Sequence, residues 1–469
     1  MLLSVLIPVY NERFRVRECV RQVLAAPLPE GVDREIIIVD DGSKDGTRDL
    51  LATVAAEHAN ELRLILHEVN QGKGAAIRTA IRAASGDIML IQDSDLEYDP
   101  REYPKLLAPI LDGEADAVYG SRFLPADRRR VLYYWHTLGN QGLTMLSNMF
   151  TNLNLTDMET CYKAVLSPFI KQLPIRSDRF GIEPELTAKL AKQHARIFEV
   201  PISYHGRTYE EGKKINLSDA FKALYVVVRY WLIDDLYGED RIGQMYLHQL
   251  EKATHFYAWQ GDVIKKYLGA RVLEIGAGIG TLSARFCQRD RYIATDPDEM
   301  FAQRLAHRFA QRPNVRVAKL DPSSVADVLA LDETVDTVVC LNVLENIQDD
   351  KAALMNLRHA LEDNGRLVVM VPQGEELYGS IDKAIGRCRR YSRDHLIALI
   401  TDAGYTIERV IPFNRIGYVG WWLNGKILAR QELGRVQLKI LDSLMWAVKR
   451  LDPLLPWPGL SLIVVARKS

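Results

Sequence analysis

The sequence predicts an α/β protein built from two domains. Short apolar runs alternate with helical stretches, which is the pattern of βαβ units around a parallel sheet. This pattern occupies the first 120 residues and restarts near residue 270. A length of 469 residues also fits two or three domains at roughly 100 to 200 residues each. We therefore predict a first domain at 1–236, a linker at 237–260 and a second domain at 261–469.

The first domain is expected to contain four strands joined by helices. Its strands at Ile36–Val39 and Ile88–Ile91 are continuously apolar, which is typical of strands covered on both faces. The apolar stretch Phe221–Leu236 is interrupted by charged residues, so a buried or interfacial helix is expected there. The remaining strands are expected at Ser4–Val9 and Leu62–Leu66, with helices at Arg13–Ala26, Gly46–Ala59 and Gly74–Ala84.

The second domain is expected to contain seven strands, again separated by helical stretches. Five of them precede residue 372 and alternate with helices, which indicates a second parallel arrangement. Two strand-like runs close the chain. The seven are Val272–Ile275, Tyr292–Thr295, Val315–Leu320, Val335–Leu341, Leu367–Val371, Ile407–Pro412 and Ser461–Ala466.

Composition and charge exclude several classes of function. The 60 basic and 61 acidic residues leave a net charge of −1, so nucleic acid is not an expected partner. Five scattered cysteines with no paired CxxC spacing argue against a disulfide framework or a zinc site. No run reaches 18 uncharged apolar residues, and the apolar N-terminus ends too early for a signal peptide. We expect a cytoplasmic protein, and peripheral contact with the cytoplasmic membrane face stays open.

Three polar clusters follow strands of the first domain, at 8–12, 40–43 and 93–97. Ligands of open α/β sheets bind beyond the carboxyl ends of the strands, where these clusters are expected to meet. Asp93 and Asp95 stand two apart, so one turn can aim both carboxylates at one point. Such a pair suits Mg²⁺ together with the phosphate oxygens of a substrate. A solvated acidic turn is the alternative.

Four ordered motifs, SVLIPVYNE, IIIVDDGSKDGT, NQGKGAAIRTAI and QDSDLEYDP, resemble those of the family 2 glycosyltransferases. The likeness is nearest to the dolichyl-phosphate mannose synthase branch and covers about residues 1–235. It implies a GT-A fold and an inverting transfer from a nucleotide-diphosphate sugar with Mg²⁺ or Mn²⁺. A polyprenyl phosphate or a glycolipid is the acceptor that the resemblance suggests.

The same resemblance assigns roles to individual residues. Nucleoside contacts would come from Pro8, Tyr10, Glu12 and Asp40, and nucleotide support from Gly72 and Lys73. The metal ligands would be Asp93, Asp95 and Glu97. The segments YGSRF, TDMETCYK and RFGIEPELTAKL match the acceptor side. They supply the phosphate ligand Arg122 and the candidate acids Asp157, Glu159, Glu183 and Glu185, among which the sequence does not choose.

Two further segments of the first domain carry open alternatives. The segment Ile202–Ile215, with Arg207 and Lys213, resembles the family's mobile loop over the diphosphate, or is a solvated loop. Three arginines at 128–130 precede the aromatic stretch VLYYWHTLGNQGLTMLSNMF. Basic residues beside aromatic ones suit contact with anionic lipid, although a buried helical hairpin explains the stretch nearly as well.

A glycine-rich turn follows the first strand of the second domain. It reads Glu274-x-Gly276-x-Gly278-x-Gly280, and Thr281 stands where a nicotinamide-binding motif would have its third glycine. The turn resembles motif I of class I methyltransferases, which have a Rossmann-like fold and use S-adenosylmethionine. That resemblance covers about residues 245–469. It implies cofactor contacts from Glu274, Gly276, Gly278, Gly280, Asp296, Asp321 and Asn342.

The methyl-acceptor side departs from related domains. Asn346 stands where they commonly have histidine, and Gly386–Tyr391 reads GRCRRY instead of GHxRRY. The acceptor-side candidates are Glu345, Asn346, Arg390 and Tyr391. The predicted function is a bifunctional enzyme of glycan or glycolipid biosynthesis that adds a sugar and methylates a hydroxyl. The alternative is an active glycosyltransferase with a non-catalytic, cofactor-binding or scaffolding second domain.

Overall fold

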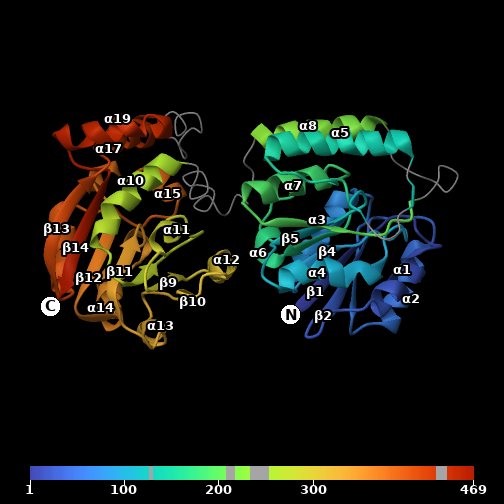
Figure 1. The fold of residues 1–469 in the computed structure, drawn as a ribbon, viewed down its shortest axis with the longest axis horizontal. Helices are drawn as coiled ribbons and strands as arrows, with labels where there is room; N and C mark the ends of the chain where they lie inside the picture. The colour runs from blue at the N-terminus through green and yellow to red at the C-terminus, as the bar shows by residue number, and fades with distance from the viewer. Residues whose placement is uncertain (126–129, 132, 207–216, 233–252, 429–440) are drawn as a thin grey trace. The chain divides into compact units, whose positions relative to one another are not determined.

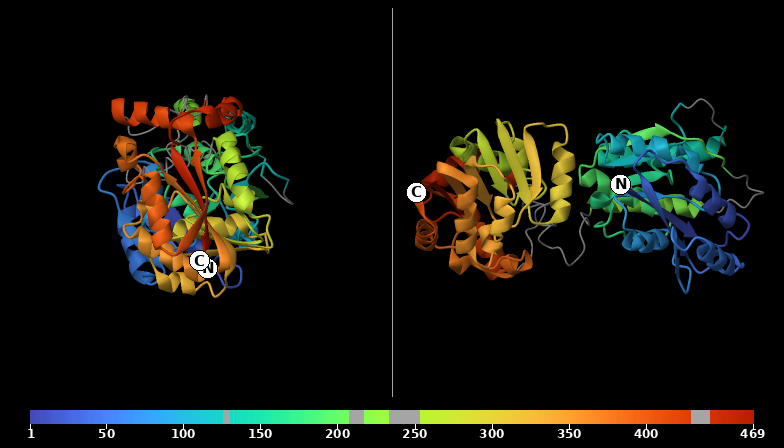
Figure 2. Two further views of the ribbon diagram at one scale, coloured as in Figure 1. Left: turned by 90° about the vertical axis from the view of Figure 1, so that its left-hand side faces the viewer. Right: turned by 90° about the horizontal axis from the view of Figure 1, so that it is seen from below.

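The computed structural model describes residues 1–125, 130–131, 133–206, 217–232, 253–428 and 441–469. The chain divides into two compact units, Met1–Gly238 and Glu239–Ser469. Each unit is built around its own seven-stranded sheet (Figures 1 and 2). The α/β class with two domains is therefore confirmed.

The sheet of the first unit has the order β3-β2-β1-β4-β6-β5-β7. The strands β1, β2, β3 and β4 are parallel, with Val9 beside Asp40 and Val5 beside Leu90. The strand β6 is antiparallel to both β4 and β5, and β7 is parallel to β5. The bounds are β1 Leu2–Val9, β2 Asp33–Asp40, β3 Leu62–Leu66, β4 Ile88–Ile91, β5 Ala117–Ser121, β6 Lys163–Leu166 and β7 Ile197–Pro201.

The helices of the first unit connect these strands. The helix α3 packs on β1 and β2, and α4 packs on β5, β6 and β7. The three helices expected from the sequence are confirmed to within three residues at each end, because their apolar positions face the sheet. The bounds are α1 Val16–Ala25, α2 Thr47–Glu57, α3 Lys73–Ala83, η1 Pro100–Glu102, α4 Tyr103–Leu111, α5 Tyr134–Thr151, α6 Ser167–Ile170, α7 Ile182–Lys192 and α8 Leu217–Leu232.

The helices α5 and α8 lie side by side, and both pack against α7 (Figure 1). The rings of Phe150 and Trp231 meet at 5.0 Å between centroids. Val227 and Tyr230 of α8 are buried, whereas Tyr225 is 62% exposed, so this helix is partly interfacial. No helix in the described part of the chain has the length and apolar character needed to cross a bilayer.

The sheet of the second unit has the order β10-β9-β8-β11-β12-β14-β13. Its first five strands are parallel, and β14 is inserted antiparallel between β12 and β13. All seven expected strands are confirmed. Their bounds are β8 Arg271–Ile275, β9 Arg291–Asp296, β10 Val315–Lys319, β11 Val335–Leu341, β12 Leu361–Pro372, β13 Tyr405–Phe413 and β14 Ser461–Lys468.

Helices cover both faces of the second sheet. Successive residues of β11 point to opposite faces, so Val338 and Cys340 join one apolar cluster and Val339 and Leu341 join the other. The helix α10 begins at Thr254, inside the range expected as linker. The bounds are α10 Thr254–Ile264, η3 Lys265–Tyr267, α11 Ser283–Phe286, α12 Glu299–Phe309, α13 Val325–Leu329, η4 Leu344–Asn346, α14 Asp350–Leu357, η5 Arg358–Ala360, η6 Glu375–Leu377, α15 Ser380–Ala384, α16 Arg393–Asp402, α17 Arg415–Trp421, η7 Trp422–Ile427, α19 Met445–Leu451 and η8 Asp452–Leu454.

Candidate active sites

The carboxyl ends of β1, β2 and β4 share one edge of the first sheet, because these strands are parallel neighbours. The three polar clusters expected from the sequence follow these strands. Asp40 is the last residue of β2, and Asp93 comes two residues after β4 ends. This edge is where an open α/β sheet binds its ligand.

Lys73 lies between two carboxylates at this edge. Its Nζ is 2.9 Å from Asp93 Oδ1 and 3.0 Å from Glu183 Oε1. Burial by itself lowers the pKa of Lys73, but the charges of Asp93 and Glu183 outweigh it and raise that pKa well above its usual value. The ammonium group therefore stays charged. It joins the turn after β3, the loop after β4 and helix α7 at one point.

Asp41 fixes the backbone turn that presents Lys73. Its Oδ1 accepts the N–H of Gln71 at 2.9 Å, and its Oδ2 accepts the N–H of Gly72 at 2.7 Å. Gly72 has φ of 104°, and a Cβ there would lie 2.2 Å from the carbonyl oxygen of Asp178. Only glycine fits this position. The sequence placed Asp41 in a polar cluster but did not single it out.

The residues expected to contact the nucleoside differ in their exposure and in their hydrogen-bond partners. Tyr10 is 38% exposed, Pro8 is half-buried, and Glu12 is buried beside Arg15, with 3.1 Å between their charged atoms. Asp40 is fully buried, and its Oδ2 accepts Nε of Arg48 at 2.9 Å. Its Oδ1 has no hydrogen-bond partner among the described residues. Arg48 thus fixes the orientation of the Asp40 carboxylate, and Oδ1 remains able to accept a hydrogen bond.

The three residues expected to bind a metal, Asp93, Asp95 and Glu97, do not form a single cluster of ligands. Glu97 accepts the hydroxyl of Tyr204, and its backbone N–H donates to Asp95 Oδ1 at 3.1 Å. In the described part of the chain, no group of three or more His, Cys, Asp or Glu side chains is arranged to hold a metal ion. Asp93 and Asp95 by themselves still fit Mg²⁺ or Mn²⁺, because such ions take one or two carboxylates and complete their shell with phosphate oxygens and water.

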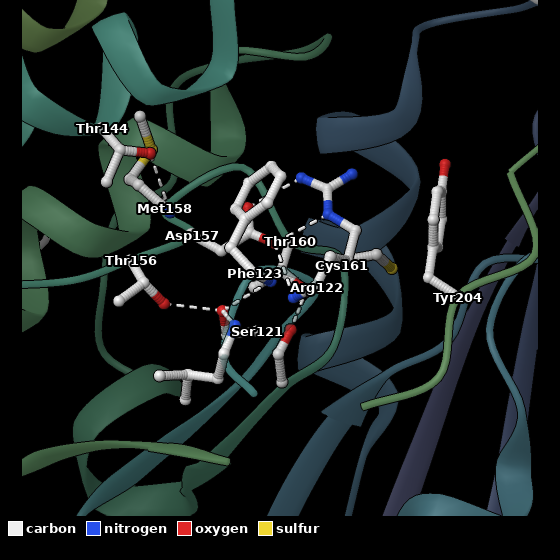
Figure 3. A network of polar contacts seen from close by, with 12 residues as sticks. Ser121, Arg122, Phe123, Thr144, Thr156, Asp157, Met158, Thr160, Cys161 and Tyr204 are labelled. Carbon is white, nitrogen blue, oxygen red and sulfur yellow. Dashed lines mark hydrogen bonds and ion pairs between the residues drawn. The ribbon is translucent and has the colours of Figure 1, made fainter. Parts of the chain in front are cut away.

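Arg122 and Asp157 form a buried, two-pronged ion pair, shown in Figure 3. Arg122 Nε and one terminal nitrogen donate to the two oxygens of Asp157, both at 2.7 Å. The guanidinium also lies 5.2 Å from the ring centroid of Tyr204. Burial lowers the pKa of Arg122, and the charge of Asp157 more than restores it. Both oxygens of Asp157 are therefore engaged, which leaves it poorly placed to accept a proton from a substrate.

Two other acids on the acceptor side keep an unused oxygen. Oε1 of Glu159 and Oε2 of Glu183 are buried without a hydrogen-bond partner in the part of the chain that the structure describes. Burial and the charge of Glu183 raise the pKa of Glu159, against the opposing effect of the buried Lys163. Glu185, in contrast, accepts the N–H groups of Arg176 and Ser177 and is structural. Arg207 and Lys213 lie outside the described residues.

The glycine-rich turn follows β8 in the second unit. Gly276, Gly278 and Gly280 all have positive φ, at 69°, 56° and 79°. A Cβ on Gly278 would meet no heavy atom within 4 Å, so this residue borders open space. The N–H of Gly278 donates to Asp296 Oδ2 at 2.9 Å. Burial raises the pKa of Asp296 to about 6. This open turn beside an acid at the end of the next strand fits the ribose of S-adenosylmethionine.

The other expected cofactor residues differ in accessibility. Glu274 is buried and accepts hydrogen bonds from the hydroxyl of Tyr292, at 2.7 Å, and from the hydroxyl of Ser283. It therefore stabilises the turn from the interior of the domain. Asn342 has φ of 57° directly after β11. Asp321 is exposed and accepts the N–H of Ser323 at 2.9 Å. Asp321 and Asn342 are the two that keep a side chain outside the core.

Glu345 is fully buried on the expected methyl-acceptor side. Neither of its carboxylate oxygens has a hydrogen-bond partner among the described residues, although Arg387 Nε lies 3.4 Å from Oε1. Burial raises its pKa to about 7, against the opposing charge of Arg387. Exposed residues adjoin it, since Cys388 donates its N–H to the carbonyl oxygen of Glu345 and Asn346 follows in the chain. A buried acid whose carboxylate accepts no hydrogen bond from the described residues thus lies next to exposed residues.

Arg390 and Tyr391 face the interior. Arg390 Nε lies 3.0 Å from Asp382 Oδ1, and its guanidinium lies 4.8 Å from the ring centroid of Trp421. The hydroxyl of Tyr391 donates to Asp350 at 2.7 Å. Both side chains therefore support the fold around Glu345.

One segment in each half of the chain matches a family model. Residues 4–171 match the model described as "Glycosyl transferase family 2", and residues 273–367 match the model described as "Methyltransferase domain". The chain joins a family 2 glycosyltransferase domain to a methyltransferase domain. The resemblance stated from the sequence is confirmed for both domains.

Relatives and solved structures are similar to the glycosyltransferase domain. An undecaprenyl-phosphate 4-deoxy-4-formamido-L-arabinose transferase from Aeromonas hydrophila is 28% identical over 212 residues, which is 45% of this chain and 62% of that protein. A dolichol-phosphate mannosyltransferase from Pyrococcus furiosus is 26% identical over 45% of this chain and 59% of its own length. This chain thus spans about three-fifths of either relative. A glucosyl-3-phosphoglycerate synthase structure from Mycobacterium tuberculosis is 22% identical, with a TM-score of 0.39, over 49% of this chain and 78% of its own.

Two residues of these domains were missed from the sequence. Asp41 in the glycosyltransferase domain could have been found, since it is the second acid of the DDGS motif. Asp382 in the methyltransferase domain carried no signal. It is fully buried and gathers Arg387, Arg390 and the indole N–H of Trp421. The two arginines follow Asp382 within eight residues, whereas Trp421 is 39 residues away, so that contact depends on the tertiary fold.

Proposed function

We propose that the glycosyltransferase domain transfers a sugar from a nucleotide-diphosphate donor to a polyprenyl phosphate, with inversion. The observation that carries this proposal is the position of Lys73 between Asp93 and Glu183 at the carboxyl edge of the sheet. The names of the Aeromonas and Pyrococcus relatives support a polyprenyl phosphate as acceptor. The product would serve glycan or glycolipid biosynthesis.

The donor would lie along the three polar clusters. Pro8, Tyr10, Glu12 and Asp40 would contact the nucleoside, and the turn at Gly72 would support the nucleotide. Asp93 and Asp95 would hold Mg²⁺ or Mn²⁺, which neutralises charge on the departing diphosphate when it is bound. Lys73 would add a fixed positive charge there.

The acceptor side would need little acid–base chemistry. A phosphate acceptor is already an anion and needs no strong base, whereas a hydroxyl acceptor would need one within hydrogen-bond reach. Glu183 and Glu159 keep unused oxygens for that second case. Arg122, whose orientation is fixed by Asp157, would present a positive charge to the acceptor.

A membrane surface would supply a polyprenyl phosphate. Helix α5 carries Tyr134, Trp135 and Met149 with 69 to 78% of each side chain exposed, and Arg130 is exposed just before it. Aromatic residues next to a cation suit the headgroup region of a bilayer. This pattern supports peripheral contact of the glycosyltransferase domain.

The test is a screen of nucleotide sugars with polyprenyl phosphate and Mg²⁺ or Mn²⁺, followed by extraction of the lipid product. Asp93→Asn and Asp95→Asn should each lower turnover by about a hundredfold or more, because each removes charge from the diphosphate site. Asp112→Asn, an exposed acid after α4, is the matched control. Unchanged turnover in both site variants would refute the metal assignment.

We propose further that the methyltransferase domain binds S-adenosylmethionine and methylates a hydroxyl of a related saccharide or lipid. The open space over Gly278 beside Asp296 carries this proposal. The bound cofactor supplies an electrophilic methyl group, so the protein has mainly to align the acceptor. Glu345 would receive the hydroxyl proton, since neither of its carboxylate oxygens accepts a hydrogen bond from the described residues.

A non-catalytic second domain is the alternative. Asn346 in place of the histidine common in related domains favours it. Isothermal titration with S-adenosylmethionine separates the possibilities in two steps. Absence of binding refutes the methyltransferase proposal outright. Binding without methyl transfer to any product of the first domain favours a scaffolding role.

A further inference from the structure

Tyr204 contacts two residues on opposite sides of the proposed glycosyl transfer. Its hydroxyl donates a hydrogen bond to Oε2 of Glu97, in the loop after β4 that also carries Asp93 and Asp95. The guanidinium carbon of Arg122 lies over the ring of the same tyrosine, 5.2 Å from its centroid (Figure 3). One side chain therefore touches both the loop with the expected metal ligands and the arginine expected to bind the acceptor phosphate.

Backbone contacts fix the segment that carries Tyr204. The next residue, His205, donates its N–H to the carbonyl oxygen of Glu97 at 2.8 Å. Tyr204 itself forms an isolated antiparallel bridge with Tyr98. Two residues earlier, the chain donates a backbone N–H to the carbonyl oxygen of Ser121, directly before the arginine, at 3.1 Å. The segment is therefore tied to the same two stretches of chain that the Tyr204 side chain contacts.

The ring of Tyr204 is also packed against its neighbours. Tyr98 is buried, and its ring centroid lies 5.1 Å from that of Tyr204, edge to face. A Cβ on Gly206 would lie 2.7 Å from Cε1 of Tyr204, so the backbone at this glycine passes close to the ring. These two contacts limit how far the ring can turn away from Arg122.

Arg122 is contacted by both Asp157 and Tyr204. Its bonds to Asp157 use Nε and Nη2, so Nη1 takes no part in that pair. A guanidinium over an aromatic ring gains about 0.5–2 kcal/mol, and arginine suits the oxygen geometry of phosphate. The contact with Tyr204 therefore restricts the direction in which Nη1 can meet a phosphate oxygen.

We propose that Tyr204 is a positioning residue for transfer to a phosphate acceptor. Its ring keeps the guanidinium of Arg122 directed to the acceptor, and its hydroxyl ties that ring to Glu97 in the loop of the donor side. The inference rests on the proposed function, because Arg122 needs this orientation only if the acceptor is a polyprenyl phosphate. It goes further in naming the residue that links the donor side of the site to the acceptor side.

The experiment measures binding of farnesyl phosphate, a short polyprenyl phosphate, to the full chain by isothermal titration. Tyr204→Leu should weaken this binding about tenfold, because the guanidinium loses the aromatic ring. Tyr204→Phe keeps the ring and loses only the bond to Glu97, so it should restore affinity to within about threefold of the original chain.

A double-mutant cycle tests whether Tyr204 acts through the arginine. Arg122→Gln/Asp157→Asn removes both charges of the buried pair, so neither charge is left alone in the interior. In this background, Tyr204→Leu should cause no further loss of farnesyl phosphate binding. Thermal unfolding shows that each variant is folded.

Two controls separate positioning from general support of the fold. Tyr103→Phe removes the hydroxyl of a buried tyrosine that donates to Gln92 at 2.8 Å, and it should leave farnesyl phosphate binding unchanged. Binding of Mn²⁺ together with UDP or GDP should be the same in Tyr204→Leu as in the original chain, because the donor side keeps its carboxylates.

Two results would overturn the proposal. One is unchanged binding of farnesyl phosphate by Tyr204→Leu. The other is an equal loss of farnesyl phosphate binding and of Mn²⁺–nucleotide binding in that variant, which would make the tyrosine a general support of the fold. An original chain that binds no farnesyl phosphate would refute the polyprenyl phosphate acceptor of the proposed function, and this inference with it.

Discussion

The ion pair of Arg122 with Asp157 shows how a single contact limits the chemistry of an acid. Asp157 is fully buried, and both of its carboxylate oxygens accept hydrogen bonds from the guanidinium of Arg122. Removing either partner of such a pair would leave an uncompensated charge in the interior. The acid therefore stabilises the acceptor side of the site and keeps Arg122 oriented.

Removing this carboxylate tests its structural role. Asp157→Asn should lower the free energy of unfolding by about 3–5 kcal/mol, because Arg122 would remain buried without its counter-charge. Urea unfolding measures the difference. Arg17→Gln breaks an exposed pair with Glu57 and should cost less than about 1 kcal/mol. Equal effects of the two variants would contradict the assignment.

The pH dependence of cofactor binding tests Asp296. Burial raises its folded-state pKa to about 6, above the value of 3.8 for a free side chain. Its contribution to stability is therefore full below pH 4 and is lost as pH rises through 6. Ribose hydroxyls donate best to the ionised form, so the affinity for S-adenosylmethionine should weaken about tenfold from pH 7 to pH 5. Titration calorimetry of Asp296→Asn should show a weaker affinity without this dependence.

At the scale of elements, buried strands were predictable and side-chain partners were not. Ile36–Val39 and Ile88–Ile91 are continuously apolar, so the sequence indicates strands covered on both faces. The helix α10 was missed because its apolar residues Phe256, Tyr257 and Trp259 show no clean period. Arg122 and Asp157 were each proposed for the site, but their pairing depends on segments 35 residues apart.

The glycine-rich turn provides a matched pair of variants. A Cβ on Gly276 would lie 2.4 Å from a methyl group of Val343, so Gly276→Ala should destabilise the domain by about 2–4 kcal/mol. Gly278 has free space, so Gly278→Ala should cost only about 1–2 kcal/mol from its positive φ. The second variant should still lose about tenfold in affinity for S-adenosylmethionine, because its methyl group enters the ligand space. Titration calorimetry measures the change in affinity, and thermal unfolding measures the change in stability.

At the scale of the molecule, each unit has its own sheet, its own core and its own strand-edge site. The two domains and their fold class followed from a pattern that restarts near residue 270. The chemistry of each site was less accessible from sequence. Glu345 was named as a candidate, but the absence of a hydrogen bond to its carboxylate from any described residue is a property of the packed fold. The periodicity of apolar residues in the sequence indicates which residues are buried. Whether a buried side chain can still accept a hydrogen bond depends on the neighbours that the fold places around it.

Two sites in one chain predict two separate responses to ligand. S-Adenosylmethionine at about one hundred times its Kd should stabilise its domain by about 2.7 kcal/mol, or about 5–10 °C in Tm. Gly278→Ala, with a tenfold weaker affinity at the same concentration, should reduce this stabilisation to about 1.4 kcal/mol and preserve the shift caused by a nucleotide sugar with Mg²⁺. Asp93→Asn should do the reverse. Differential scanning calorimetry follows both, and loss of both shifts in either variant would contradict independent sites.

The distribution of cysteine offers a chemical handle on the second site. Cys19, Cys161, Cys287 and Cys340 are buried, while Cys388 is exposed and its Sγ lies 3.7 Å from the carbonyl oxygen of Asn346. A maleimide dye added to the native chain would therefore attach at one thiol, beside Glu345. Its emission would report occupancy of the methyl-acceptor side in real time, without any engineered residue.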